Sequence, residues 1–346
     1  MKVTSSFPFG HLCFRHWHTD GSEVGVIVAK AQFQRSGPDT FRGLSKPPNI
    51  VLDDTFAGDP GTSPLQQEQD LAPGKIGADI QILGVARKSG GQAVTDWPVQ
   101  IDVERRLNYA FQVRGPSFWE PNGTGWALSA PEPVTAVPLT YSLAYGGTSL
   151  GKENELVATS ENPAGIGFVT PERLQRRDPF PAPQIGDLAE FISARPHKPM
   201  TVHGTAPIAK AWLPRRAHAG TFDDAWKQER HPRMPHDYSL RFWNAAPAAL
   251  QCADALDGDE LITVSGVSFT DAKVFARLPS LQVWVDFSGD ARATVGLVLD
   301  TVQLDLRSEA PGDHLMTLIW RGHVAEPDRF EAAEIFAERV QFAESA

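Results

Sequence analysis

Apolar and polar residues alternate with a period of two in several stretches of the chain. The rows at residues 99–104 and 107–113 are the clearest, and Arg105-Arg106 separates them. This spacing predicts half-buried strands, and the two rows predict a hairpin around the arginine pair. Similar rows begin at Val24, Leu281, Val295 and Met316. The parity of the third of these flips near Asp300-Thr301, which predicts a β-bulge or turn.

Helical patterns are few. Asp187 and Glu190 predict a short helix that runs through Phe191, and Thr221 is the expected N-cap of another that carries Trp226. The residues after Asp328 have the spacing of a capping box with Glu331. A C-terminal helix is therefore expected, with one apolar face formed by Phe330, Ala333, Ala337 and Val340.

The stretch from Thr148 to Pro214 is rich in Pro and Gly but keeps apolar anchors such as Phe168 and Trp212. Prolines interrupt a strand ladder, so ordered irregular structure is expected there. We predict a mainly β fold of antiparallel sheets in β-sandwich-like layers, with irregular insertions, a few short helices and the C-terminal helix. Three stretches of one unit are expected: an N-terminal β region at 1–130, the irregular region at 131–235, and a C-terminal β region at 236–346.

Composition narrows the class of protein. The 346 residues have a net charge of −10, which disfavours nucleic acid and anionic membrane surfaces as partners. No signal peptide follows Met1, and no run reaches the ~18 apolar residues of a membrane span. Cys13 and Cys252 are the only cysteines, so no disulfide framework is expected. A cytoplasmic protein without membrane insertion is the prediction.

Potential metal ligands cluster at His11, Cys13, His16 and His18. On a strand the first two face one side and the last two the other, so four-fold zinc coordination requires a turn at Phe14-Arg15. The alternative is a strand with surface histidines and a buried thiol. Residues 257–260 resemble part of a calcium loop but are too short, and a turn before Leu261 is favoured. No metal and no cofactor is predicted.

Catalytic motifs give little support for an enzyme. No G-x-S-x-G elbow occurs, and residues 146–151 are interpreted as a glycine turn after Tyr145. Arg215-Arg216 either binds a carboxylate on a partner or forms ion pairs within the fold. Tryptophan is favoured in interfaces as well as in cores. The candidate partner-binding residues are Trp119, Trp126, Tyr145, Trp212, Arg215, Arg216 and Trp226.

Several short motifs occur in an order that resembles a known family. They are Asp54 with Gly58-Asp59-Pro60, Asp70 to Lys75 with Asp79, Pro138 to Tyr141 with Ala144 to Gly147, Asn162-Pro163 with Gly165 to Gly167, Trp212 to Arg215, Gly220 to Asp223 with Trp226, Pro232 to Pro235, Leu278-Pro279, and Trp320 to Gly322. Together they span about Asp53 to Gly322. The sequence thereby resembles the domain-of-unknown-function family that type VI secretion clusters encode beside the VgrG spike and PAAR-repeat tip proteins.

This resemblance implies a cytosolic adaptor that binds a toxic effector, PAAR-containing or PAAR-linked, and helps to load it onto the VgrG spike. It implies no enzymatic activity. The acidic charge favours a partner with a basic or neutral docking face. Two alternatives stay open: a β-sandwich hydrolase acting on glycan or cell-wall material, and a structural piece of the secretion machine.

Overall fold

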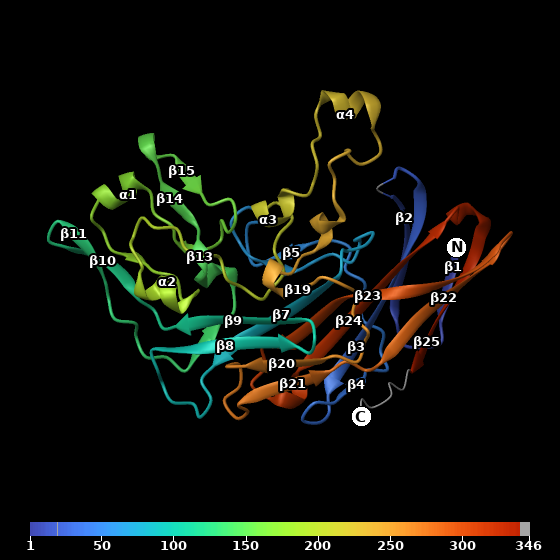
Figure 1. The fold of residues 1–346 in the computed structure, drawn as a ribbon, viewed down its shortest axis with the longest axis horizontal. Helices are drawn as coiled ribbons and strands as arrows, with labels where there is room; N and C mark the ends of the chain where they lie inside the picture. The colour runs from blue at the N-terminus through green and yellow to red at the C-terminus, as the bar shows by residue number, and fades with distance from the viewer. Residues whose placement is uncertain (19, 340–346) are drawn as a thin grey trace.

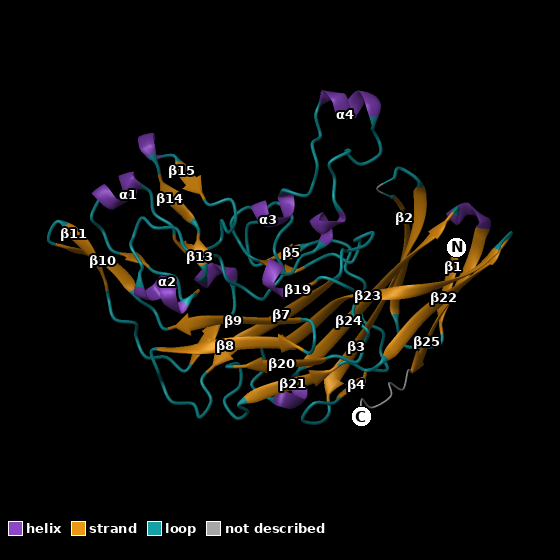
Figure 2. Ribbon diagram, in the orientation of Figure 1, coloured by secondary structure: helices purple, strands orange, loops and turns teal. Residues whose placement is uncertain are grey.

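Strands make up most of the regular structure (Figure 2). The computed structural model describes residues 1–18 and 20–339. The mainly β prediction is confirmed, because the alternating rows form antiparallel sheets. The strands are β1 Lys2–Ser5, β2 Gly10–Trp17, β3 Glu23–Arg35, β4 Phe41–Gly43, β5 Thr55–Phe56, β6 Leu65–Gln67, β7 Ala78–Arg87, β8 Asp96–Val103, β9 Leu107–Arg114, β10 Phe118–Asn122, β11 Gly125–Leu128, β12 Ala136–Pro138, β13 Tyr145–Gly146, β14 Thr148–Leu150, β15 Leu156–Ala158, β16 Ile166–Gly167, β17 Phe180–Pro181, β18 Ile185–Gly186, β19 Gln251–Cys252, β20 Leu261–Ser265, β21 Lys273–Arg277, β22 Leu281–Gly289, β23 Arg292–Leu306, β24 Leu315–Ala325 and β25 Phe330–Arg339. The α-helices are α1 Pro171–Gln175, α2 Leu188–Ile192, α3 Leu213–Arg216 and α4 Asp224–Glu229.

The largest sheet joins the first and last strands of the chain. Its order is β1-β25-β22-β23-β24-β3-β2, and β4, β7, β12 and β19 branch from this path. The pairings are antiparallel except that β1 runs parallel to β25 and β7 runs parallel to β23. The sheet curls into a half-barrel, on the right in Figure 1.

The longest strand, β23, changes its neighbour along its length. Residues 292–297 pair with β22, whereas residues 301–306 pair with β7. The register against β24 shifts between Leu299 and Thr301, at the position where the parity of the sequence flips. The predicted bulge is confirmed. It lies in β23 between the part that pairs with β22 and the part that pairs with β7.

A second sheet has the order β18-β9-β8-β20-β21. In β8 the residues Val99, Ile101 and Val103 are buried and their neighbours are more exposed, as the alternation predicted. β8 and β9 form the expected hairpin, with Arg105 at a φ of 64° in the connection.

The two sheets contribute to one hydrophobic core. It contains Val99 and Ile101 from β8 together with Ile80 and Ile82 from β7. In the large sheet the core residues alternate with polar ones: Lys30, Gln303 and Thr317 each stand between two buried core residues and therefore point to the opposite face. Around these residues the opposite face is polar and is covered by the segment around residues 67–75, whereas farther along β3 it carries the apolar Val24, Val26 and Val28.

The irregular region contains short elements, as predicted. Asp187 caps α2, because its carboxylate accepts the backbone N–H of Ala189 at 2.7 Å. The N-cap of α4 was expected at Thr221, but it lies two residues later, at Asp223. Asp223 accepts the N–H of Trp226 at 2.8 Å, whereas the hydroxyl of Thr221 donates to Asp237.

The predicted C-terminal helix is wrong. Residues 330–339 form β25, which pairs with β1 on one side and β22 on the other. The register shifts between Ser288 and Gly289, so Ala332 and Phe330 face consecutive residues of β22 and Glu331 is extra. This irregularity places Phe330 and Ala333 three residues apart on the buried side, which imitates helical spacing. Val340, assigned to the same helix face, lies outside the described residues.

The N-terminal and C-terminal β regions expected at 1–130 and 236–346 share their sheets. β3 pairs with β24, and β8 pairs with β20. The middle region attaches to them through β12 on β7 and β18 on β9. Within the described part of the chain, no helix has the length and apolarity needed to cross a membrane.

Candidate functional site

Charged residues from distant parts of the sequence meet on the polar face of the large sheet. We call this set the buried charge network, and its members are Lys30, Asp54, Glu68, Asp70, Lys75, Asp79, Lys210, Arg215, Asp300 and Arg321. Five are basic and five acidic, so the formal charge is 5 − 5 = 0. Most of them belong to the motifs that carry the family resemblance.

Glu68 links two parts of this network. Its Oε1 accepts a hydrogen bond from Nη2 of Arg215 at 2.7 Å, and its Oε2 lies 3.5 Å from Nζ of Lys75. Lys75 also donates to Oδ2 of Asp79 at 2.8 Å. Asp79 accepts two further bonds, from Nδ2 of Asn244 at 2.9 Å and from the backbone N–H of Ala245 at 2.7 Å. These bonds connect α3 and the segment before residue 250 to the start of β7.

A second branch binds the covering segment to the strands. Lys30, on β3, donates to Oδ2 of Asp70 at 2.8 Å, and the same oxygen accepts the N–H of Val51 at 2.8 Å. Arg321, on β24, forms an ion pair with Asp300 at the bulge. Its Nη2 also lies 3.5 Å from the backbone carbonyl of Asp70. Both strands therefore hold the chain around residue 70.

The electrostatics of this network stabilise the charged forms of Glu68 and Lys75. Burial raises the pKa of Glu68, but Lys75, Arg215 and Lys210 outweigh burial and hold its pKa below the usual value. Burial lowers the pKa of Lys75, and the carboxylates of Asp79 and Glu68 reverse that shift. A general acid needs a raised carboxyl pKa, which is the opposite of the shift at Glu68. The arrangement suits a structural role, in which the ion pairs attach the chain around Glu68, Asp70 and Arg215 to the large sheet.

Sequence reasoning missed Lys30, Glu68, Lys210 and Asp300 as members of this network. Lys30 gave a signal, because it continues the row Val24, Val26 and Val28 and stands between Ala29 and Ala31. A charged residue at such a position is seldom buried unless it is paired. Glu68 gave no signal, since it stands in a polar stretch without periodicity.

Three of the predicted partner-binding residues are buried inside the chain. Trp119 is 5% exposed and packs with Phe180, and Trp212 is 2% exposed and meets the ring of Tyr141 edge-on at 5.5 Å. Arg215 is also 2% exposed, and its guanidinium is used by Glu68 and two backbone carbonyls. Their side chains are therefore buried against other parts of the same chain. Of the two roles considered for Arg215, the structure shows the ion pair within the fold.

The other four lie nearer the surface but at separate places. Trp126 is half-buried on β11, under the guanidinium of Arg177 at 5.8 Å. Tyr145 is half-buried on β13, and burial raises the pKa of its hydroxyl. Arg216 is exposed on α3, and Trp226 is half-buried on α4. The structure therefore does not bring the seven residues into one patch.

A projecting segment carries Trp226. We call residues 217–238 the aromatic arm; it leaves the body after α3 and carries α4 at its outer end (Figure 1), while Arg233 contacts the ring of Trp17 on β2, 6.0 Å from its centroid. Phe222 is 54% exposed there, and its ring meets Trp226 edge-on at 4.8 Å. The arm thus presents an apolar ring pair outside the core.

Internal bonds define the shape of the aromatic arm. Nε1 of Trp226 donates to the carbonyl of Arg233 at 2.8 Å, and the ring of His231 lies 5.4 Å from the indole. At the base, Asp237 accepts both the N–H and the hydroxyl of Thr221, at 2.9 and 2.8 Å. The two sides of the arm are therefore connected at its tip and at its base.

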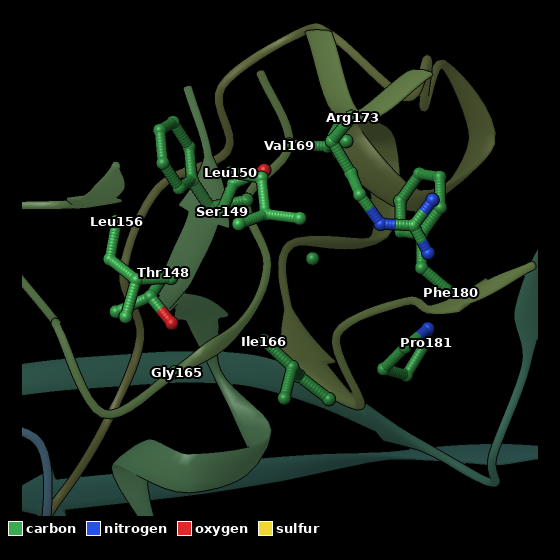
Figure 3. A pocket seen from close by; sticks show the side chains of 13 residues that line it. Thr148, Ser149, Leu150, Leu156, Gly165, Ile166, Val169, Arg173, Phe180 and Pro181 are labelled. Carbon is green, nitrogen blue, oxygen red and sulfur yellow. The ribbon is translucent and has the colours of Figure 1, made fainter. Parts of the chain in front are cut away.

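The glycine-rich motifs surround a hollow of about 250 Å³ (Figure 3). Two of its polar side chains, those of Ser149 and Arg173, are already engaged. Ser149 accepts the N–H of Thr170 at 3.0 Å, and Arg173 donates to the carbonyls of Asp178 and Pro179 at 3.4 Å. Figure 3 shows Arg173 beside Phe180, whose ring centroid lies 6.0 Å from the guanidinium carbon. Ser149 therefore serves the local structure. A glycine turn was expected over residues 146–151, but only Gly146 and Gly147 have the positive φ of such a turn, and Thr148–Leu150 form the strand β14.

The potential metal ligands near the N-terminus do not converge. β2 continues through Phe14 and Arg15 without a turn, so His11 and Cys13 lie on the face opposite to His16. His18 follows the strand, and its ring lies 6.0 Å from that of His323. The strand expected in the alternative interpretation agrees with the structure, but Cys13 and the histidines are all half-buried, whereas a buried thiol and surface histidines were expected.

Among the described residues, Asp257, Asp259 and Glu260 have carboxylate oxygens within 4.8 Å of one another. Glu260 accepts the N–H groups of Asp257 and Gly258 at 2.9 Å each, and Arg106 lies 3.0 Å from it. These bonds form the turn that precedes β20, which is the structure predicted for this segment.

Comparison with known families gives one match. Residues 20–321 match a family described as an uncharacterized protein conserved in bacteria, DUF2169. The chain belongs to this family. The matched range of DUF2169 contains the buried charge network and the aromatic arm, but it leaves out the strands β1, β2 and β25 of the large sheet. No curated protein and no solved structure matched the chain.

Proposed function

We propose that this DUF2169 protein is a cytoplasmic adaptor that binds a type VI secretion effector and helps to load it onto the VgrG/PAAR spike. The resemblance of its motifs to proteins encoded in such clusters supports the proposal. The aromatic arm is the docking surface, and the buried charge network holds the base from which the arm projects.

The exposure of Phe222 carries this assignment. An apolar ring that is 54% exposed gains free energy when a partner covers it, and aromatic anchors dominate many protein interfaces. Phe222 and Trp226 both stand in motifs of the resemblance, yet their rings lie outside the core. Their role is therefore better explained by binding than by packing.

The local charge of the arm agrees with a partner that is not strongly basic. Residues 217–238 contain Lys227, Arg230 and Arg233 against Asp223, Asp224, Glu229 and Asp237, so the net charge is 3 − 4 = −1. The whole chain has −10. Contact through the arm thus depends on apolar burial more than on charge steering.

The test is co-expression with a candidate toxin, chosen from the genes that neighbour the one for this chain. Wild-type protein should capture the toxin in a pull-down and raise its soluble yield. Phe222→Ala should reduce capture strongly, because truncation of an aromatic anchor costs about 2 kcal/mol or more of binding free energy.

Ile192→Ala is the matched control, since Ile192 is 77% exposed on the short helix α2. This variant should capture the toxin as well as wild type does. Equal capture by Phe222→Ala would exclude the arm as the docking surface, and no capture by wild type would count against the adaptor function. One equivalent of zinc in the purified protein would instead favour the hydrolase alternative.

A further inference from the structure

A second hollow lies at one end of the half-barrel, where β3, β4, β22 and β25 meet. We call it the mouth pocket; its volume is about 660 Å³. Phe7, Phe33, Leu281 and Ala337 supply apolar walls. Pockets of roughly 300–1,000 Å³ with mainly apolar walls are typical of small-molecule sites, including those in the mouths of β-barrels.

Gly43 keeps this space open. A Cβ on Gly43 would lie 3.5 Å from the ring of Phe33 and 3.7 Å from the ring of Phe7. These are ordinary contact distances, so the backbone tolerates a side chain there, but a longer side chain would extend into the hollow. The backbone conformation of Gly43 does not require glycine. The volume of the pocket therefore depends on the absence of a side chain at this position.

The charge of the mouth pocket differs from that of the whole protein. Its lining includes Arg42 and Arg339 and contains no Asp or Glu. Within the described residues neither arginine has a carboxylate within 4.0 Å. Both side chains belong to exposed residues. In a chain with 42 acidic and 32 basic residues, such a pair beside apolar walls is unexpected without a function.

We infer that the mouth pocket binds an aliphatic carboxylate, with the acyl chain between the phenylalanine rings and the carboxylate bound by Arg42 and Arg339. Arginine suits this role because its guanidinium is always charged and can donate two parallel hydrogen bonds to a carboxylate. Each methylene buried against the apolar walls adds to the affinity. This site is separate from the aromatic arm, so it does not depend on the adaptor function.

The experiment is isothermal titration calorimetry of the delipidated full chain with dodecanoate and, separately, with dodecyltrimethylammonium. The two probes share their tail and differ in the charge of the head. Dodecanoate should bind with one site per chain, and dodecyltrimethylammonium should bind at least tenfold more weakly. Equal affinity for both would overturn the inference, because it would show that the arginines do not select the head group.

Variants locate the binding. Arg42→Gln and Arg339→Gln should each weaken dodecanoate binding roughly tenfold, the effect of losing one charge-assisted hydrogen bond. Gly43→Leu should abolish it. Arg292→Gln is the control, because Arg292 is an exposed arginine on β23 that does not line the pocket.

Unchanged binding in all three pocket variants would overturn the inference. So would an absence of dodecanoate binding to wild type, which would leave a partner protein's apolar side chain as the competing occupant. If Gly43→Leu fails to fold, the two exposed arginine variants still decide the outcome.

Discussion

Nη2 of Arg215 donates to Oε1 of Glu68 at 2.7 Å, across 147 residues of sequence. The guanidinium also donates to the carbonyls of Ile208 and Phe242, at 2.7 and 2.9 Å. This one side chain therefore holds the covering segment, the approach to α3 and the chain that returns from the aromatic arm. The arginine pair that the sequence offered for binding a partner is divided, since Arg215 points inward and Arg216 is exposed.

Replacing Arg215 should destabilise the fold severely. Arg215→Met leaves Glu68 buried with Lys75 at 3.5 Å as its remaining close cation. Breaking a buried pair on one side costs about 3–5 kcal/mol. The free energy of unfolding, measured by urea denaturation, should fall by that amount. Arg216→Met on the same helix should change it by less than about 0.5 kcal/mol. Similar losses in both variants would contradict the role assigned to the ion pair.

Gly77 should tolerate no side chain. Its φ is +65°, and a Cβ would lie 1.9 Å from the carbonyl oxygen of Cys252 on β19. Gly91 has a φ of +68° but nothing within 4 Å of its Cβ position. Gly91→Ala should cost about 1–2 kcal/mol, the strain of the left-handed conformation alone. Gly77→Ala should cost more than about 4 kcal/mol, because β19 must also move away from β7. Thermal unfolding of the two variants separates the backbone strain from the clash, and equal losses would show that the contact with Cys252 is unimportant.

His314 should make stability depend on pH. Its side chain is buried, and Nε2–H donates to the carbonyl of Ser308 at 3.1 Å. Burial lowers its pKa, and Arg35 and Arg87 lower it further, against the opposing effects of the Ser308 bond and Asp305. The unfolded chain therefore binds a proton below about pH 6.5 that the folded chain resists. The free energy of unfolding that the neutral His314 side chain contributes is complete above that pH. It is lost as the pH falls toward the lowered pKa of the folded state.

The measurement is the free energy of unfolding between about pH 7.5 and 5. His314→Gln retains an N–H donor without the titration, so its stability should decline less steeply than that of wild type. His236→Gln, at an exposed position, should leave the slope unchanged. An identical slope in wild type and His314→Gln would show that the buried histidine does not contribute.

The sheets could be predicted from the sequence where one strand face is buried and the other is not. β8 and β9 show this most clearly, and the bulge at Asp300 was visible as a flip of parity. The C-terminal strand could not be predicted in the same way. Its residues Glu331, Ala332, Ala333 and Glu334 favour helix, and the extra residue at Glu331 disguises the period of two. Pairing with β1 and β22 overrides these local preferences, and that pairing is not encoded locally.

The candidate site was predictable only in part. Motif residues such as Asp70, Lys75 and Asp79 could be singled out by resemblance, but their mutual contacts depend on strand order. That order brings β7 beside β23, more than two hundred residues away, and no periodicity reveals it. The exposure of Phe222 was equally hidden, because an aromatic residue beside a short helix is compatible with either core or surface.

The parallel pairing of β1 with β25 has a consequence for synthesis. Residues 2–5 align with residues 332–335, so β1 can take its place only after β25, more than three hundred residues later, has been made. Long-range pairings of this kind make folding slow. Until β24 and β25 have been made, one edge of β3 and one edge of β22 lack their neighbours and are open to wrong pairing. A product truncated before β25 would keep β1 unpaired and that edge of β22 exposed.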